Sequence, residues 1–427
     1  MSNNIQAIRG MNDVLPNNVQ CWQYVEKVLS KIVTAYGYHE IRLPLLEKTD
    51  LFVRTIGEIT DIVEKEMYTF LDRNQDSLTL RPEGTASCVR AGIQHGLLYN
   101  QIQKLWYMGP MFRHERPQKG RFRQFYQFGV EVFGLAGPDI DAELLLMSAR
   151  FWKALKISEK VVLHINTIGT KQARALYKKK LVEYFSANSA LLDQDSKRRL
   201  NTNPLRILDS KNPDLAGLIK NAPKLLDHLD SESQEHFDGL CRILDKAKLP
   251  FIIDPCLVRG LDYYGLTVFE WVTTEPGAQN AICAGGHYDE LVEELGGKAT
   301  PALGFAVGLE RLIDLVASDQ KINYENPPHA YMIMLGDNAV ISGVLLAEKL
   351  RNLLPNLQII VNCGDGNLTN QLKKADKSGA LFALILGEEE MRNEEITIKN
   401  LRTTNTKKFE QMRVKINELE NFFTSLE

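Results

Sequence analysis

The stretch MFRHERPQKGRFRQFYQFGVEVFG, residues 111–134, joins two strand-like runs by a short cationic segment. The runs, residues 105–114 and 122–133, are rich in aromatic and β-branched residues, and this pattern predicts an antiparallel hairpin. Five cations fall within eleven residues of the connection, namely Arg113, Arg116, Lys119, Arg121 and Arg123. A solvated hairpin loop would explain these charges equally well, so charge alone does not establish a binding site.

The second run of this hairpin carries polar groups on one face. Residues two apart in a strand share a face, so Phe128, Val130 and Val132 point one way. Gln127 and Glu131 then point the other way. A carboxylate on a strand bounded by apolar residues needs a cationic or hydrogen-bonding partner. Its sequence neighbours supply no obvious partner, so we expect a positively charged ligand to bind here.

The stretch LVRGLDYYGLTVFEW, residues 257–271, contains charges in an apolar setting. The apolar run predicts strand structure over residues 251–271, yet Arg259 and Asp262 lie within it. Removing a charge from water is costly unless a partner compensates for it. Both side chains are therefore predicted to have specific partners.

Three further segments are candidates for ligand contacts. TLRPEGTA, residues 79–86, places Glu83 and Thr85 after a proline, and a capped helix start is the simpler interpretation of that pattern. CAGGHYDELVEELGG, residues 283–297, has paired glycines that would let the backbone approach a ligand closely. ALGFAVGLERL, residues 302–312, has small residues ahead of an arginine, a pattern typical of tight packing between a strand and a helix.

The remaining sequence indicates more than one domain. Apolar residues between Pro16 and Gly37 have the spacing of an amphipathic helix. Residues 171–247 lose the strand-like runs and indicate a helical insertion, and residues 318–330 are polar with two prolines, as in a linker. Beyond the linker, strand and helix patterns alternate, which predicts a small α/β domain with a partly parallel sheet.

Composition excludes several classes of protein. The 427 residues carry a net charge of −3, and the six cysteines form no CxxC pair, so neither a disulfide framework nor a zinc or other metal site is predicted. No phosphate-binding loop, dinucleotide fingerprint, serine elbow or HExxH motif occurs. The N-terminus lacks the apolar core of a signal peptide, and no uncharged apolar run approaches membrane-spanning length. We therefore expect a cytoplasmic protein without a membrane segment.

Taken together, these stretches resemble the class II aminoacyl-tRNA synthetases, and most closely the bacterial histidyl-tRNA synthetases, over essentially the whole chain. FRHE followed by Arg121-x-x-x-Phe125 resembles motif 2, GFAVGLERL resembles motif 3, and residues 40–64 resemble motif 1, the dimer interface of the class. LVRGLDYY and CAGGHYDELVEELGG resemble the two signatures of the histidyl enzymes, although His287 and Glu290 replace a common Arg and Gly. ADKSGALFALILGEEE resembles the C-terminal anticodon-binding domain.

The resemblance implies a fold and an activity. The fold would be an α+β catalytic domain with a mostly antiparallel sheet over residues 1–325, a helical insertion at 171–247, and an α/β anticodon-binding domain at 326–427. The enzyme would activate L-histidine with ATP to histidyl-adenylate, release pyrophosphate, and transfer histidine to the 3′ end of tRNA(His). Mg²⁺ is expected with ATP, and a homodimer is expected.

The resemblance also implies roles for individual residues. Arg113 and Arg259 would be catalytic, with Arg259 facing the reacting phosphate and not a protein carboxylate, whereas Asp262 would be a structural partner. Histidine binding is implied for Glu83, Gly84, Thr85, Arg113, Gln127, Glu131, Arg259, Tyr263 and Tyr264. ATP binding is implied for Arg113, Glu115, Arg121, Phe125 and Arg311, with adenine between Phe125 and Arg311.

Two alternatives differ in function. A catalytically silent relative would serve as a regulatory subunit of the first enzyme of histidine biosynthesis, but such proteins usually lose the phosphate-gripping arginines and the C-terminal domain, and this chain keeps both. A synthetase for another amino acid of the same subclass would share the C-terminal domain but not LVRGLDYY. Exchange of pyrophosphate into ATP distinguishes these alternatives, because it reports which amino acid is activated.

Overall fold

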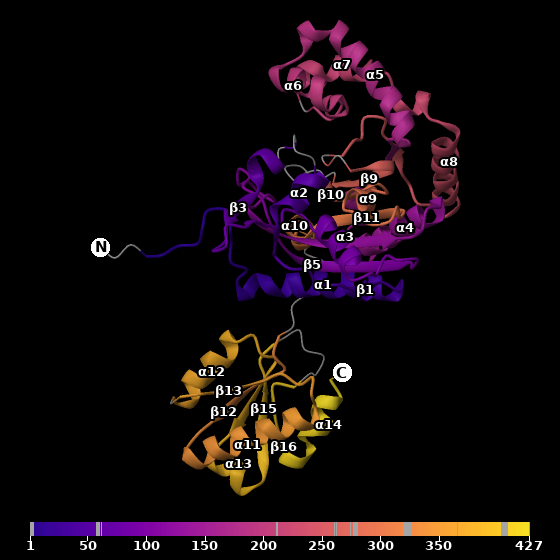
Figure 1. Cartoon of the computed structure of the whole chain (residues 1–427). Coiled ribbons are helices and arrows are strands. Elements are labelled where there is room, and N and C mark those ends of the chain that lie inside the picture. Colours follow the sequence, from indigo (N-terminus) through magenta and orange to yellow (C-terminus); the bar gives the residue numbers. More distant parts are fainter. Residues whose placement is uncertain are drawn as a thin grey trace. The chain divides into compact units, whose positions relative to one another are not determined.

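The computed structural model describes residues 4–56, 60, 62–210, 212–259, 261, 263–273, 275, 281–318, 327–364, 366–402 and 409–426. The chain divides into two compact units, Met1–Tyr324 and Glu325–Glu427 (Figure 1). Among the described residues, no helix has both the length and the apolar character needed to cross a bilayer.

An eight-stranded sheet forms the centre of the larger unit. Its order is β1 (His39–Glu40), β5 (Gln103–Phe112), β6 (Gln124–Phe133), β11 (Ala302–Gly308), β10 (Ala281–His287), β9 (Gly265–Thr273), β7 (Val161–Thr167) and β8 (Ile252–Ile253). Neighbouring strands are antiparallel except at the two edges, where β1 pairs with β5 and β7 pairs with β8 in parallel. The predicted α+β class with a mostly antiparallel sheet is confirmed.

The hairpin predicted from residues 111–134 is formed by β5 and β6, which pair from Gln103↔Phe133 to Phe112↔Gln124. Phe128, Val130 and Val132 are fully buried in the main core, as the alternation predicted. The opposite face of β6 therefore carries Gln127 and Glu131 towards a separate environment.

Helices cover the apolar face of this sheet (Figure 1). α1 (Pro16–Ala35), α4 (Pro138–Ala154) and α10 (Leu309–Ala317) contribute to one apolar core with the central strands. The segment 171–247 is mainly helical, with α5 (Lys171–Ala187), α6 (Gln194–Thr202), α7 (Ala216–Lys220) and α8 (Ser231–Lys246). α5 to α7 lie together at one end of the unit, whereas α8 packs beside α4 through Phe237, Leu240 and Leu244.

The expectation of strand structure over residues 251–271 is wrong for most of its length. Only β8 and β9 are strands, and the described residues from 254 to 264 form a connection between them. The apolar character of this connection has another cause, because Leu257, Val258, Tyr263 and Tyr264 are buried by tertiary contacts and not by strand pairing. Asp262 lies outside the described residues.

The smaller unit contains a five-stranded sheet in the order β13 (Ile359–Val361), β12 (Ala330–Met334), β14 (Phe382–Leu386), β15 (Glu395–Asn400) and β16 (Gln411–Lys415). β12 is parallel to both β13 and β14, so the partly parallel α/β sheet is confirmed. α11 (Asp337–Leu353) and α12 (Leu368–Lys377) connect these strands. The antiparallel strands β15 and β16 were not predicted from the sequence.

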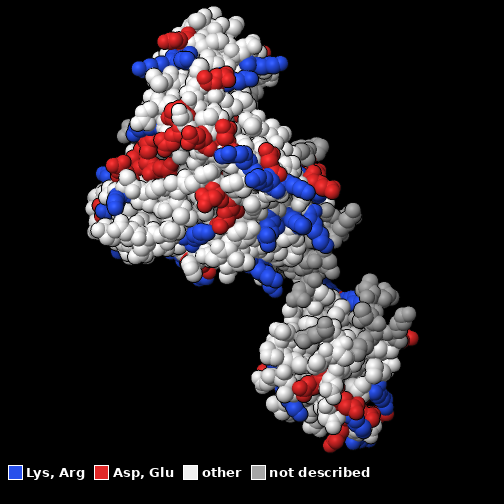
Figure 2. Space-filling model, turned by 90° about the vertical axis from the view of Figure 1, so that its right-hand side faces the viewer, with Lys and Arg blue, Asp and Glu red and all other residues white. Residues whose placement is uncertain are grey.

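Charged side chains of both signs occur on the surface. Figure 2 shows acidic and basic groups in separate clusters on one face of the larger unit, and neither sign covers that face. This distribution agrees with the small net charge of −3. Among the residues described, this face therefore carries no continuous basic surface that would identify a functional site.

Candidate active site

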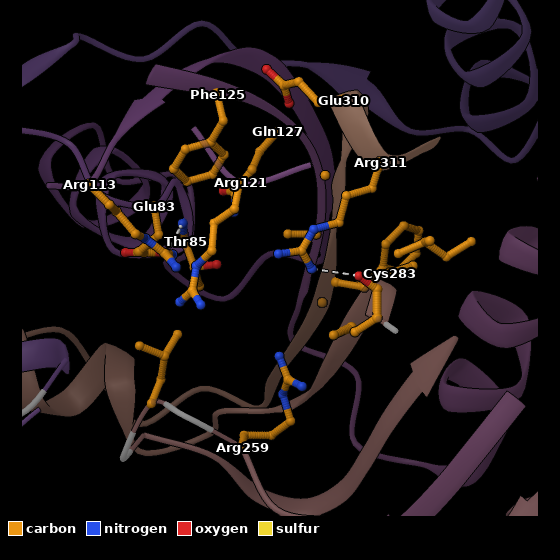
Figure 3. A pocket seen from close by; sticks show the side chains of 18 of the residues that line it. Glu83, Thr85, Arg113, Arg121, Phe125, Gln127, Arg259, Cys283, Glu310 and Arg311 are labelled. Atoms are coloured by element: carbon orange, nitrogen blue, oxygen red, sulfur yellow. Dashed lines mark hydrogen bonds between the residues drawn. The ribbon is translucent and has the colours of Figure 1, made fainter. Parts of the chain in front are cut away.

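A cavity lies against β6, β10 and β11 and is closed by segments that are distant in sequence (Figure 3). The sequence-predicted residues that line it are Glu83, Thr85, Arg113, Glu115, Arg121, Phe125, Gln127, Arg259, Tyr263, Tyr264 and Arg311. Two predicted residues, Gly84 and Glu131, do not line it. Most of the predicted site residues therefore meet in one place.

Arginine side chains give this cavity its chemical character. Arg113, Arg121, Arg259 and Arg311 all line it, and Figure 3 shows them extending towards the same space. Burial lowers the pKa of Arg113, and burial together with the charges of Arg121 and Arg113 lowers the pKa of Arg311. Four cations crowded into a partly dehydrated space create a strong preference for an anion.

Backbone carbonyls orient two of these guanidinium groups. Arg113 donates from Nε to the Pro82 carbonyl oxygen at 2.8 Å. Arg311 donates from Nε to Gly120 at 3.0 Å and from Nη1 to Ala281 at 2.7 Å. A guanidinium has five N–H donors, so these bonds fix each group and leave further donors for a ligand.

Arg259 has a protein carboxylate as its partner, and the expectation that it faces none is wrong. Its Nη1 forms an ion pair with Glu270 Oε1. Arg259 and Glu270 were predicted to lie on one continuous strand. In the structure Arg259 lies in the connection before β9, and its side chain reaches Glu270 on β9. Burial is the largest single effect on the pKa of Arg259 and lowers it, but Glu270 together with Tyr264 and Tyr263 raises it by more, so the net shift is upward. Among the described residues, Arg259 Nε has no hydrogen-bond partner.

Glu115 and Arg121, both predicted to contact ATP, form an ion pair with each other. The Glu115 side chain is buried, whereas that of Arg121 is partly exposed. Phe125 lies beside them in the cavity wall, with its ring centre 5.3 Å from the Arg113 guanidinium carbon. Four of the predicted ATP-binding residues, Arg113, Glu115, Arg121 and Phe125, are therefore linked by direct contacts, whereas Arg311 is held by Gly120 and Ala281.

Glu83 caps a helix and also faces the cavity. Its carboxylate accepts hydrogen bonds from the backbone N–H groups of Thr85 at 2.6 Å and Ala86 at 2.9 Å, at the start of α3 (Thr85–Gln94). The simpler interpretation, a capped helix start, is therefore correct for these two contacts. Burial raises the pKa of Glu83 despite these bonds.

Glu131 has hydrogen-bonding partners within the protein, so the expectation that it lacks them is wrong. Its carboxylate accepts from Thr85 Oγ1 at 2.8 Å, from the Tyr107 hydroxyl at 3.0 Å and from the Tyr288 hydroxyl at 2.5 Å. Burial is the largest cause that raises its pKa to about 8, against the opposing effect of these bonds. Thr85 and Tyr288 line the cavity, so Glu131 lies immediately behind its wall.

Glycines make room for these groups. A Cβ atom on Gly84 or Gly129 would lie 2.2 Å or 2.1 Å from Tyr107 ring atoms, and one on Gly304 would lie 1.9 Å from Glu131 Oε2. Real Cβ contacts are never so short. These three positions therefore accept no side chain unless Tyr107 or Glu131 moves.

Sequence reasoning missed four residues of this site: Tyr107, Glu270, Tyr288 and Glu310. Tyr107 and Tyr288 bond Glu131, Glu270 bonds Arg259, and Glu310 accepts from the Tyr126 N–H at 2.9 Å and 3.0 Å. Burial raises the pKa of Glu310 to about 7. Glu270, Tyr288 and Glu310 lie inside stretches that the sequence analysis singled out, and their polar groups were the available signal.

Comparison with known proteins follows the same division of the chain. A family model described as histidyl-tRNA synthetase matches residues 10–312, and one described as anticodon binding domain matches residues 329–426. The solved histidyl-tRNA synthetase of S. aureus is 34% identical, with a TM-score of 0.82 and coverage of 98% of this chain and 100% of that chain.

Two more distant structures share the fold. A histidyl-tRNA synthetase from Nostoc is 20% identical, with a TM-score of 0.72 and 99% coverage of both chains. A Bacillus halodurans protein named ATP phosphoribosyltransferase regulatory subunit/histidyl-tRNA synthetase is 21% identical, with a TM-score of 0.63 and coverage of 91% of this chain and 100% of that chain.

The family model covers most of the larger unit, and the arginine-lined cavity lies inside the region that it matches. The second family model covers nearly all of the smaller unit. The S. aureus enzyme matches both units in a single alignment. The chain therefore belongs to the histidyl-tRNA synthetase family and is an ATP-dependent histidine–tRNA ligase.

Proposed function

We propose that both steps of the ligation take place in the arginine-lined cavity. In the first step the carboxylate of L-histidine attacks the α-phosphorus of ATP, which forms histidyl-adenylate and releases pyrophosphate. In the second step the histidyl group passes to the 3′ end of tRNA(His). The nucleophile of the first step is part of the substrate, so the protein needs only to position reactants and stabilise charge. The convergence of four arginines in one cavity is the observation that carries this proposal.

In this proposal each arginine contacts a different part of ATP or a different side of its α-phosphate. Arg113 and Arg259 bind the α-phosphate from two sides, and Arg121 binds the distal phosphates. Arginine suits these tasks because its planar group bridges two oxygens and keeps its charge. Adenine lies between Phe125 and Arg311, and Glu115 accepts a hydrogen bond from its amino group. The lining of the cavity by all five residues supports this arrangement.

Histidine lies against the opposite part of the cavity. Glu83, Thr85 and Gln127 bind its α-amino group. Gln127 Oε1 is buried and has no hydrogen-bond partner among the described residues, which supports this role. Tyr263 and Tyr264 contact the imidazole, with ring centres 4.8 Å apart. Glu131 accepts the imidazole N–H, since a carboxylate has about four acceptor sites and three hydroxyls use only part of them. Gly84 contributes by leaving space for Tyr107.

Mg²⁺ enters this site with the triphosphate of ATP. The carboxylates among the described lining residues are Glu83, Glu115 and Glu310, and each has a partner in the protein. Mg²⁺ commonly keeps several waters and binds substrate phosphates. We therefore assign it to the substrate and to no ligand set of this chain. The protein residues supply the remaining positive charge.

Pyrophosphate exchange into ATP, run with each of the twenty amino acids, tests the proposed activity. Exchange with histidine alone is expected, because a pocket that hydrogen-bonds both ring nitrogens leaves buried groups unpaired with any other amino acid. Sites of this kind reject analogues by about 10⁴–10⁵-fold. Exchange with no amino acid would favour the regulatory alternative, and exchange with a different amino acid would contradict the assigned substrate.

Transfer to tRNA involves parts of the chain outside the cavity. We assign residues 1–325 to catalysis and residues 326–427 to the anticodon, and the segment 171–247 to the acceptor arm of tRNA. Lys179 on α5 and Lys197 on α6 are exposed in this segment. Arg199 instead pairs with Asp195 at 2.8 Å, so it has a structural role.

Replacing Lys179 and Lys197 together by glutamine is expected to raise the KM for tRNA and to leave ATP–pyrophosphate exchange unchanged. Phosphate contacts release counterions, so aminoacylation by the wild type should also fall more steeply with salt than exchange does. The matched control is Lys27→Gln with Lys31→Gln, two exposed lysines on α1 that are far from this segment in sequence. Equal loss of both activities, or an equal effect of the control pair, would contradict the tRNA contact.

The residues resembling motif 1 are assigned to a homodimer interface. Leu45 and Leu46 are large apolar side chains that remain exposed in this segment, and burial between two copies would remove them from water. Sedimentation should report twice the chain mass of 48.4 kDa, and a monomer would contradict this assignment. We place the enzyme in the cytoplasm, where its substrates are used for protein synthesis.

A further inference from the structure

Asp141, His236 and His287 converge at a place that the aminoacylation reaction does not use. They come from α4, α8 and the end of β10, and none of them lines the arginine-lined cavity. Their donor atoms all lie within 4.8 Å of one another. Among the described residues this is the group of His, Cys, Asp and Glu side chains with the spacing of a metal site.

The geometry around Asp141 is that of a shared ligand. His287 Nε2 lies 2.9 Å from Asp141 Oδ2, and His236 Nε2 lies 3.3 Å from Asp141 Oδ1. Zinc–nitrogen and zinc–oxygen bonds are about 2.0–2.2 Å, so ligand atoms around a tetrahedral ion are roughly 3.3–3.6 Å apart. The 3.3 Å separation lies at the edge of this range and the 2.9 Å separation lies below it, so His287 and Asp141 would move slightly apart to admit an ion.

Two of these donor atoms contact each other without a well-aligned hydrogen bond. Asp141 Oδ1 and His236 Nε2 are buried and 3.3 Å apart, and neither makes a hydrogen bond of good geometry within the described part of the chain. The side chains of Asp141, His236 and His287 are 2%, 10% and 0% exposed, so water cannot fully solvate them. A buried polar contact of poor geometry leaves both atoms incompletely satisfied, and a metal ion between them would satisfy both at once.

A second carboxylate supports His287 from behind. Its other ring nitrogen, Nδ1, lies 3.2 Å from Asp289 Oδ1, which also accepts from the Ala302 N–H at 2.7 Å. Metal-binding histidines usually donate their second N–H to a carboxylate, which fixes the ring and strengthens the ligand. A histidine held between a buried carboxylate and an outer one therefore has the surroundings of a zinc ligand.

We propose that Asp141, His236 and His287 bind one divalent transition-metal ion, with Zn²⁺ the best match to two imidazoles and one carboxylate. The ion would replace a proton on His287 Nε2, which passes to solvent. Because the ligands come from three elements, the ion would tie α8 to α4 and to the end of β10. The chemistry in the arginine-lined cavity would not depend on it.

The test measures zinc uptake by the full-length enzyme after chelation and dialysis. The wild type is expected to retain one zinc per chain and to melt at a higher temperature with zinc than without it. His236→Gln should lose both effects, because it removes one ligand and leaves the pairing of His287 with both carboxylates. The matched control is His164→Gln, since His164 also pairs with an aspartate, at 3.1 Å, but has no third ligand. It should retain both effects.

Two further measurements separate this site from other zinc binding. Asp289→Asn should weaken zinc affinity by about 10–100-fold, the usual effect of removing a supporting carboxylate. Cobalt substitution should give the visible bands of tetrahedral nitrogen and oxygen coordination. A thiolate charge-transfer band would show that ions bind the six cysteines instead. That band, absence of stoichiometric uptake in the wild type, or undiminished uptake by His236→Gln would overturn the proposal.

Discussion

Replacing Arg259 by alanine is expected to lower the kcat of histidine adenylation by about 10²–10³-fold and to change histidine affinity by no more than several-fold. Donors aimed at charge that develops in the transition state have effects of this size, and they act on kcat more than on binding. Arg259 lines the cavity, and the described structure gives its Nε no partner. Single-turnover formation of histidyl-adenylate is the measurement that isolates this step.

The ion pair between Arg259 and Glu270 requires a control, because the alanine variant leaves Glu270 without its cation. An unpaired, largely buried carboxylate destabilises a protein, and that effect would be mistaken for catalysis. The double variant Arg259→Ala with Glu270→Gln removes both charges. We expect it to recover melting temperature but not kcat. Recovery of kcat in the double variant, or a large loss of histidine affinity with kcat unchanged in the single variant, would remove Arg259 from the reaction.

Above pH 8, where the Glu131 carboxyl group is ionised, replacing Glu131 by glutamine is expected to weaken histidine binding by about 1.5–3 kcal/mol, the range for a hydrogen bond to a charged group. ATP affinity should hardly change, because the three residues that hydrogen-bond Glu131, namely Thr85, Tyr107 and Tyr288, are not among those assigned to ATP. Calorimetric titration of each ligand is the measurement. Equal losses for histidine and ATP would show that Glu131 supports the whole cavity and does not recognise the imidazole.

The same variant should change how stability depends on pH. Burial raises the pKa of Glu131 from 4.5 to about 8 in the folded protein. A carboxyl group with a raised pKa contributes stability that is complete below its unfolded value and is lost as pH rises through the folded value. The free energy of unfolding should therefore fall between about pH 4.5 and 8 in the wild type, and less so in Glu131→Gln. Chemical denaturation at each pH tests this, and parallel curves would contradict it.

The spacing of apolar and polar residues was sufficient to predict the strands that carry the site. Residues two apart on β6 share a face, and the structure confirms that Val130 is buried while Glu131 faces the other way. The same alternation was available in β15, where Ile396 and Ile398 are fully buried, and it was overlooked. The start of α4 also had a signal, since Pro138 occupies its first turn.

The partners of charged groups were not predictable in this way. Tyr288 reaches Glu131 from after β10, and Tyr107 reaches it from β5. Glu270 meets Arg259 because the intervening segment turns back on itself. These contacts depend on strand order and on the path of a connection, and neither is encoded in the spacing of residues along one element. Composition and periodicity identified which groups needed partners, but only the fold identified the partners.

The close fit of Gly84, Gly129 and Gly304 limits how this enzyme can be redesigned for other amino acids. Their missing side chains are already replaced by Tyr107 and by the Glu131 carboxylate. Libraries that vary these glycines would mostly yield misfolded or collapsed pockets. A side chain at Gly84 or Gly129 requires that Tyr107 be shortened first, whereas Gly304 stays closed by the Glu131 carboxylate and by the Val130 carbonyl oxygen. The order in which mutations are introduced therefore matters as much as their identity.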